Sequence, residues 1–160
     1  MNDVKTRTPE AMRARSAARL AAVQALYQME TGGGGVETTV REFRDHRLGT
    51  ELDGDAIVEG DASFFEDIVR GVVEIQDKID PYIERRLSKG WTLKRLDATA
   101  RAILRCGLFE LVRRADVPAR TVIDEYVELA HDFFDEDEAG FVNGVLDAAA
   151  KDVRASEMTK

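Results

Sequence analysis

The sequence predicts an all-α protein, and three observations support that prediction. Only three prolines occur in 160 residues, whereas alanine, leucine, arginine and glutamate, which are good helix formers, are abundant. Apolar residues recur at steps of three and four along most of the chain, the period of a helix face. Clusters of glycine, proline and aspartate separate these segments. We therefore expect about seven helices arranged as small helical bundles within a single domain over 1–160.

The first helix is expected over 9–30, because Pro9 suits a first-turn position and apolar residues recur with a helical period behind it. The expected buried stripe comprises Met12, Leu20, Val23 and Tyr27. A run of glycines at 32–35 ends this helix. It lacks the lysine and the preceding strand of a phosphate-binding loop, so no nucleotide site is expected there. A second helix is expected over 36–47.

A Gly- and Asp-rich surface loop is expected over 49–60, followed by a third helix that Asp61 or Ser63 caps. We expect Asp80-Pro81 to end the third helix and to begin a short fourth one, which Lys89-Gly90 closes. The Lys89-Gly90 turn, where this short helix ends, is a natural boundary between two halves of the chain. It divides the chain into approximate subdomains, an N-terminal bundle over 9–90 and a C-terminal bundle over 91–155.

Three more helices are expected after this boundary, at about 94–114, 118–134 and 138–153, each with a wide apolar stripe. The acidic run before the last helix could bind a hard cation, but it lacks the glycine and terminal glutamate of a calcium loop. The simpler interpretation is that Asp135 or Asp137 caps the last helix, where neighbouring carboxylates favour its positive end.

Charge is distributed unevenly along the chain. The formal net charge is −8, which argues against indiscriminate binding of nucleic acid. The segment 5–29 nevertheless carries +4, since its only acid is Glu10, and the remainder carries −12. The basic residues of this segment are Lys5, Arg7, Arg13, Arg15 and Arg19.

These arginines border the expected buried face of the first helix. A solvated helix flank is the plain interpretation. The alternative is a surface for single-stranded RNA, on which guanidinium groups contact phosphates and bases stack on aromatic rings. Tyr27 and Phe141 are placed for stacking, and Asn143 can offer an amide to a base edge. The plain interpretations are a core residue at the rim for Phe141 and a solvated polar position for Asn143.

Nothing in the sequence indicates catalysis, a cofactor or a metal site. His46 and His131 lie far apart without neighbouring ligands, so both are expected at or near the surface. Cys106 is expected to be a packed small side chain, and a single cysteine fits a reducing interior. No apolar stretch approaches the roughly 20 residues that span a bilayer, and the N-terminus does not resemble a signal peptide. We expect a cytoplasmic protein.

Four phrases occur in order along the chain: ARSAARLAAVQALYQ from Ala14, LDATARAILRCGLFEL from Leu96, DVPARTVIDEYVELA from Asp116 and GFVNGVLD from Gly140. Together they closely resemble the NusB family of transcription antitermination factors, over nearly the whole chain. The resemblance implies two small helical bundles set perpendicular to each other and no enzymatic activity. It also implies binding of boxA RNA together with NusE, a small-subunit ribosomal protein. Such binding helps RNA polymerase to resist termination on ribosomal RNA operons.

Carried over position by position, the resemblance assigns functional residues to the first, fifth and last helices. The RNA-binding set comprises Arg13, Arg15, Arg19, Tyr27, Arg105, Asp137, Phe141 and Asn143. The set expected to contact NusE comprises Tyr27, Arg101 and Arg105. Ser16 and Ala17 interrupt the arginine run that relatives often carry, so we expect fewer phosphate contacts from this helix and a greater dependence on Lys5 and Arg7. Ala100 stands where relatives often carry an acidic side chain directed at NusE.

Two other functions stay open at this stage. One is a helical module that binds only proteins, for which single-stranded RNA of boxA type would have no advantage over a scrambled sequence. The other is a stand-alone relative of the N-terminal domain of certain ribosomal RNA methyltransferases, which would need an attached cofactor-binding domain. Some members of the family dimerise and so cover the RNA surface, which leaves a homodimer open.

Overall fold

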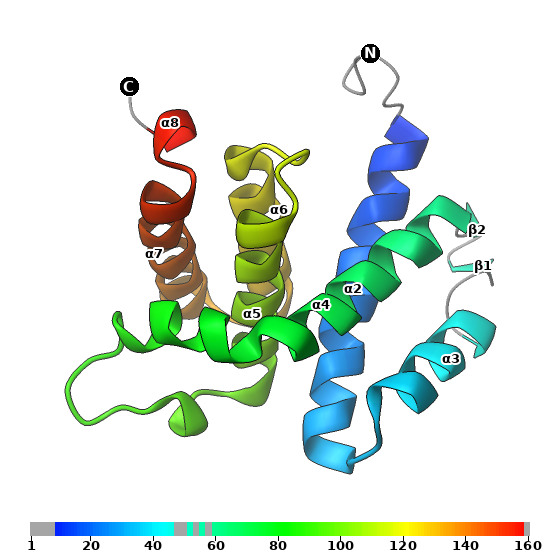
Figure 1. Ribbon diagram of the computed structural model, residues 1–160, viewed down its shortest axis with the longest axis horizontal. Coiled ribbons are helices and arrows are strands. Elements are labelled where there is room, and N and C mark those ends of the chain that lie inside the picture. Colours follow the sequence, from blue (N-terminus) through cyan, green and yellow to red (C-terminus); the bar gives the residue numbers. More distant parts are fainter. Residues whose placement is uncertain (1–8, 47–50, 53–54, 57–58, 159–160) are drawn as a thin grey trace. The chain divides into compact units, whose positions relative to one another are not determined.

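The structure is a computed structural model, and it describes residues 9–46, 51–52, 55–56 and 59–158. Figure 1 shows the chain as a series of helices, which confirms the predicted all-α fold. The elements in order are α2 (Pro9–Gly32), α3 (Val36–His46), β1 (Glu51–Leu52), β2 (Asp55–Ala56), α4 (Glu59–Glu84), η1 (Leu93–Arg95), α5 (Ala98–Arg113), α6 (Ala119–Phe133), α7 (Glu136–Val153) and α8 (Ala155–Met158).

The chain forms two compact units, residues 1–69 and 70–160, so the division falls inside α4. The sequence prediction placed the subdomain boundary later, after Gly90. The physical reason for the earlier division is that the second half of α4 contacts α5 of the second unit. Arg105 on α5 forms a double hydrogen bond with Asp80 on α4, at 2.9 and 3.0 Å.

The first unit packs α2 against α3 and the beginning of α4. The rings of Phe43 on α3 and Phe65 on α4 stack with their centroids 5.6 Å apart. Arg44 and Glu66 join the same two helices through a 2.9 Å ion pair at the surface. The buried face of α2 is built mainly from alanines, which contribute Ala14, Ala18, Ala21, Ala22 and Ala25. Their small side chains allow neighbouring helices to approach closely.

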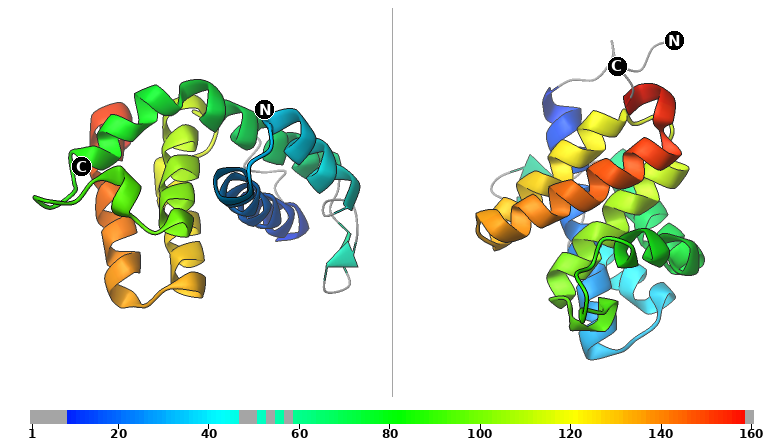
Figure 2. Two further views of the ribbon diagram at one scale, coloured as in Figure 1. Left: turned by 90° about the horizontal axis from the view of Figure 1, so that it is seen from below. Right: turned by 90° about the vertical axis from the view of Figure 1, so that its left-hand side faces the viewer.

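The second unit is built around α5, α6 and α7, which run side by side in both views of Figure 2. Gly107 on α5 lies where a side chain would press on Leu146 of α7 and Tyr126 of α6, so a glycine permits the close approach of the three helices. The hydroxyl group of Tyr126 donates a 2.5 Å hydrogen bond to the buried carboxylate of Glu110.

The predictions around α4 were wrong in two places. The helix begins at Glu59, so the positions of Asp61 and Ser63 lie inside it and not at its start. Pro81 also lies inside the helix, which departs from helical geometry at Ile75 (φ −115°, ψ 22°) instead. Two helical segments therefore meet at a kink, as the sequence predicted, but the kink lies at Ile75, before the proline, and the buried side chains of Ile79 and Ile83 lie on either side of Pro81.

Several boundaries also differ from prediction. The stretch 49–60, expected as a loop, contains the pair β1–β2, with Glu51 opposite Ala56, and the start of α4. Residues 94–114 are two elements, because η1 ends at Arg95 with Leu96 as its C-cap, and Asp97 begins α5 by accepting from the backbone N–H groups of Thr99 and Ala100. The short helix α8 was not predicted. Met12, expected in the core, is 53% exposed.

Arg154 and Glu157 form hydrogen bonds with backbone groups at two helix ends of the second unit. Arg154 is buried and donates to the carbonyl oxygens of Leu111 and Arg114, each at 2.8 Å, and of Glu110 at 3.2 Å. Glu157 accepts from Arg154 at 2.7 Å and from the backbone N–H of Ala119 at 2.7 Å. Arg154 therefore satisfies carbonyl groups at the end of α5, and Glu157 satisfies an N–H group at the start of α6.

The Glu157 contacts predict a pH-dependent contribution to stability. The hydrogen bond from the Ala119 backbone and the neighbouring Arg154 lower the pKa of Glu157 below its usual 4.5. A lowered folded-state pKa stabilises the fold above the unfolded value and loses that effect as the pH falls through the folded value. We expect Glu157→Gln to be less stable than the wild type at pH 7, with the difference shrinking as the pH falls below 4.5. Urea unfolding across pH 3–7 measures this; a constant difference would contradict it.

Gly71 on α4 is a position where added volume should be costly. A Cβ atom there would lie 2.0 Å from a ring carbon of Phe109, a side chain that is only 2% exposed. We expect Gly71→Ala to destabilise the protein by about 1–3 kcal/mol in urea unfolding, because a buried ring must move. The matched control is Gly144→Ala on α7, which meets nothing within 4 Å and should be neutral or stabilising. Equal stability of the two variants would contradict the packing described here.

Candidate nucleic-acid interface

The three arginines predicted on the first helix are not equivalent. Arg13 is exposed, Arg15 is half-buried and Arg19 is 3% exposed. The guanidinium carbons of Arg15 and Arg19 lie 4.4 and 4.9 Å from the centroid of the Phe64 ring on α4. The expectation that all three border the buried face is therefore wrong for Arg19, which is part of that face. Both contacts are cation–π interactions, which hold the two guanidinium groups at defined positions.

The exposed side of α2 carries Arg13 and Tyr27. At 100° per residue these two positions lie about 40° apart around the helix axis. Tyr27 continues the apolar period of the helix, yet it is 43% exposed. Its ring is accessible to a stacking partner, as the RNA hypothesis requires. Lys5 and Arg7, which extend the basic segment, lie outside the residues that the structure describes.

The start of α7 is an acidic, well-capped helix end. Asp135 is the N-cap residue and accepts from the backbone N–H groups of Asp137 at 3.1 Å and Glu138 at 3.5 Å, which confirms the predicted cap. A side-chain hydrogen bond with Glu138 lowers the pKa of Asp135, and the same bond raises the pKa of Glu138. Negative charge here is stabilised by the helix N-terminus.

The other residues predicted on α7 lie on different sides of the helix. Asp137 and Phe141 are four residues apart and share one side, with Asp137 exposed and Phe141 half-buried. Asn143 is exposed about 160° around the axis from Phe141. A ligand that contacts both Phe141 and Asn143 must therefore wrap around the start of α7.

The two arginines predicted on α5 are engaged within the second unit. Arg101 is 7% exposed and donates to the carbonyl oxygens of Leu93 at 2.8 Å and Leu96 at 2.7 Å, holding η1 beside α5. Arg105 forms the double hydrogen bond with Asp80, and its side chain is 14% exposed. Both guanidinium groups therefore position neighbouring segments of the second unit, and their contact with a partner stays a prediction.

No candidate metal centre is found in the part of the chain that the structure describes. No group of three His, Cys, Asp or Glu residues there could hold a metal ion. Cys106 is buried, and burial raises the pKa of its thiol well above the usual value, with a further contribution from Glu110. His46 and His131 are exposed, as predicted. Among the described helices none is long and apolar enough to cross a membrane.

The fold and these surfaces define a small helical binding protein with an arginine-bearing first helix and a polar, capped last helix. The chain belongs to the NusB family, whose sequence pattern matches residues 16–151. It is 57% identical to the transcription antitermination protein NusB of Caulobacter vibrioides over 140 residues, which cover 88% of this chain and 94% of that protein. It is 50% identical to the protein of the same name from Nitrobacter hamburgensis over the full length of both.

Solved structures give the same result. A structure of T. maritima NusB is 32% identical, covers 86% of this chain and 90% of its own, and superposes with a TM-score of 0.71. A crystal structure of the antitermination factors NusB and NusE in complex with dsRNA contains a chain that is 29% identical and superposes with a TM-score of 0.70. That match covers 88% of this chain and 98% of the other.

Proposed function

We propose that this protein is a non-enzymatic transcription antitermination factor that binds boxA-type single-stranded RNA together with NusE and promotes processive transcription of ribosomal RNA operons. The observation that carries the proposal is the match, over 88% of the chain, to a protein crystallised with NusE and RNA. Membership of the NusB family supports it independently.

The geometry of each unit supports the proposed RNA-binding residues. On α2, Arg13 is the exposed cation and Tyr27 the exposed ring, whereas Arg15 presents a half-buried guanidinium group that Phe64 holds. On α7, Phe141 offers a ring for stacking and Asn143 an amide for a base edge. The net charge of −8 suppresses non-specific binding of polyanions, and the local cations supply the salt-dependent attraction.

Three residues take revised roles. Arg19 is a positioning residue, because it lies inside the first unit against Phe64. Arg101 and Arg105 position η1 and α4. The residues proposed to contact NusE are Tyr27 in the first unit and, in the second unit, Arg101 and Arg105 on α5. The proposal places the factor in the cytoplasm, within the antitermination complex of RNA polymerase.

The test is a titration of boxA-type single-stranded RNA and of a scrambled strand of equal length, each with and without NusE. The proposal expects a preference for the boxA-type strand that NusE increases. Equal affinity for the two strands would contradict it and would favour a module that binds only proteins. The mass of the free protein in solution decides whether a homodimer competes with RNA.

A further inference from the structure

A second basic surface lies outside the residues discussed so far, in the connection between α4 and α5. We call residues 85–95 the Trp91 loop. It contains no Asp or Glu, and its cations are Arg85, Arg86, Lys89, Lys94 and Arg95. This +5 segment stands out in a chain of net charge −8. Figures 1 and 2 show the connection extending away from the helices of the second unit.

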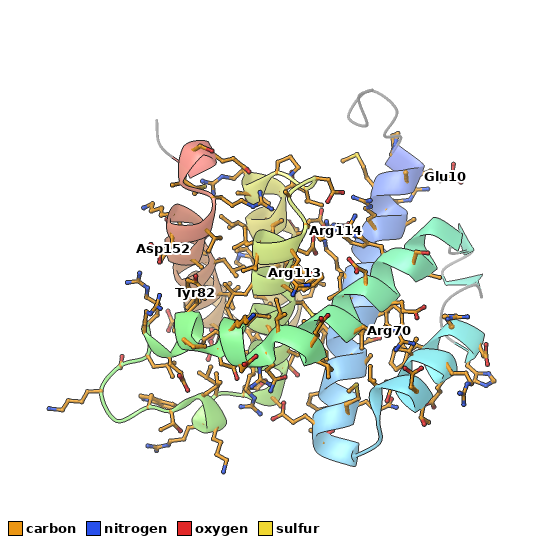
Figure 3. The ribbon with its side chains drawn as sticks, in the orientation of Figure 1. Glu10, Arg70, Tyr82, Arg113, Arg114 and Asp152 are labelled. Atoms are coloured by element: carbon orange, nitrogen blue, oxygen red, sulfur yellow. The ribbon has the colours of Figure 1, made fainter. Side chains whose placement is uncertain are left out.

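Most of this charge is not neutralised by carboxylates. Arg86, Lys89 and Lys94 are exposed, and no carboxylate of the described residues forms an ion pair with any of them. Arg85 has only a loose ion pair, at 3.9 Å, with the exposed Asp152. Side chains tipped with nitrogen stand out from this connection in Figure 3. The loop therefore presents cations that are available to an anionic ligand.

The loop also holds an exposed aromatic ring in a defined place. Trp91, the only tryptophan of the chain, is 50% exposed. The guanidinium group of Arg95 lies 5.0 Å from its ring centroid and donates a 2.7 Å hydrogen bond to the carbonyl oxygen of Gly90. Gly90 adopts a φ of 90°, which favours glycine, and the Trp91 N–H donates to the Ser88 carbonyl at 2.9 Å. These contacts fix the turn on which the ring stands.

The Trp91 loop is distant from the start of α7. Arg85 contacts Asp152, near the end of α7, and also stacks on Tyr82, which Figure 3 labels on α4. Asp137 lies fifteen residues before Asp152 on the same helix, which corresponds to about 22 Å at 1.5 Å per residue. A ligand bound at Asp137 and Phe141 must therefore extend along the second unit to reach the loop.

We propose that the Trp91 loop is a second contact for single-stranded RNA and binds nucleotides that flank the boxA-type segment. The inference rests on the function proposed above. Its basis is the combination of unpaired cations, which attract phosphates, with an exposed and positioned ring, on which a base can stack. A neutral or basic protein surface would gain nothing from the uncompensated positive charge, so this chemistry favours a polyanion.

The experiment compares two RNA strands on the full-length protein. The short strand contains only the boxA-type sequence, and the long strand adds unpaired nucleotides on both sides. The test variants are Trp91→Ala and a triple variant that combines Arg86→Gln, Lys89→Gln and Lys94→Gln. The charge-matched control combines Arg41→Gln, Lys78→Gln and Arg120→Gln. Circular dichroism and NusE affinity are measured for every variant.

We expect the wild type to bind the long strand more tightly than the short one. Trp91→Ala should weaken binding of the long strand about fivefold or more, because base stacking is lost. The loop triple variant should flatten the salt slope for the long strand by about 2, since each phosphate contact on a single strand contributes roughly 0.7. Both test variants should bind the short strand like the wild type. The control variant should bind the long strand with the wild-type preference and the wild-type salt slope. The long strand should also quench the fluorescence of Trp91, whereas the short one should not.

Two results would overturn the inference. One is that the wild type binds the short strand, while the loop variants bind the long strand with the same affinity as the wild type does. The other is that the loop variants lose affinity for NusE and not for RNA, which would make the loop a protein contact. Failure of the wild type to prefer the boxA-type strand over a scrambled one would instead refute the proposed function on which the inference rests.

Discussion

Replacing Arg154 with alanine should lower the free energy of unfolding by about 3–5 kcal/mol. The side chain of Arg154 is 7% exposed, and its guanidinium group donates to three carbonyl oxygens at the end of α5 and to the carboxylate of Glu157. Removing it leaves buried polar groups without a donor and separates α8 from α5. Urea unfolding, followed by circular dichroism, measures the loss.

The control for Arg154→Ala is Lys151→Ala, one turn earlier on α7. Lys151 forms a 3.1 Å ion pair with Asp147, but its side chain is 63% exposed, so its removal should change stability by less than about 0.5 kcal/mol. If the two variants were equally stable, the hydrogen bonds of Arg154 would not contribute to the free energy of unfolding.

Phe141→Leu should weaken binding of boxA-type RNA by about 1–3 kcal/mol, which corresponds to roughly five- to 150-fold in affinity. Phe141 is half-buried near the start of α7, so part of its side chain is accessible to a base. Leucine retains most of the apolar volume but offers no ring, which separates stacking from packing. The salt slope should not change, because no phosphate contact is lost.

Affinity is measured by titration at constant salt, with circular dichroism to verify folding. Val73→Leu on α4 is a matched control, since Val73 is exposed in the same unit and is not part of the proposed surface. Wild-type affinity in Phe141→Leu would show that the ring does not stack on a base.

The helical fold was predictable because its signals are local. The three- and four-residue period, the glycine run at 32–35 and the Asp135 cap all lie within single segments, and each is confirmed. The Asp97 cap could have been found from the same signal, since aspartate precedes the apolar period of α5.

The errors arise where contacts between segments that are distant in the sequence determine which side chains are buried. The buried face of α2 consists mainly of alanines, which carry a weak hydrophobic signal, so Met12 was assigned to the apolar stripe although it is exposed. The burial of Arg19 depends on Phe64, and the engagement of Arg105 depends on Asp80. No local pattern contains these pairs, and the same is true of the packing that carries α4 through Pro81.

The most direct test of the RNA surface is the salt dependence of RNA affinity in a variant that combines Arg13→Ala and Arg15→Ala. The matched control replaces two cations outside the surface, Arg41→Gln and Lys78→Gln. If both arginines contact phosphates, the slope of log affinity against log salt should flatten by about 1.4 for single-stranded RNA, whereas the control should keep the wild-type slope. A wild-type slope and affinity in the arginine variant, with its fold intact, would contradict the account.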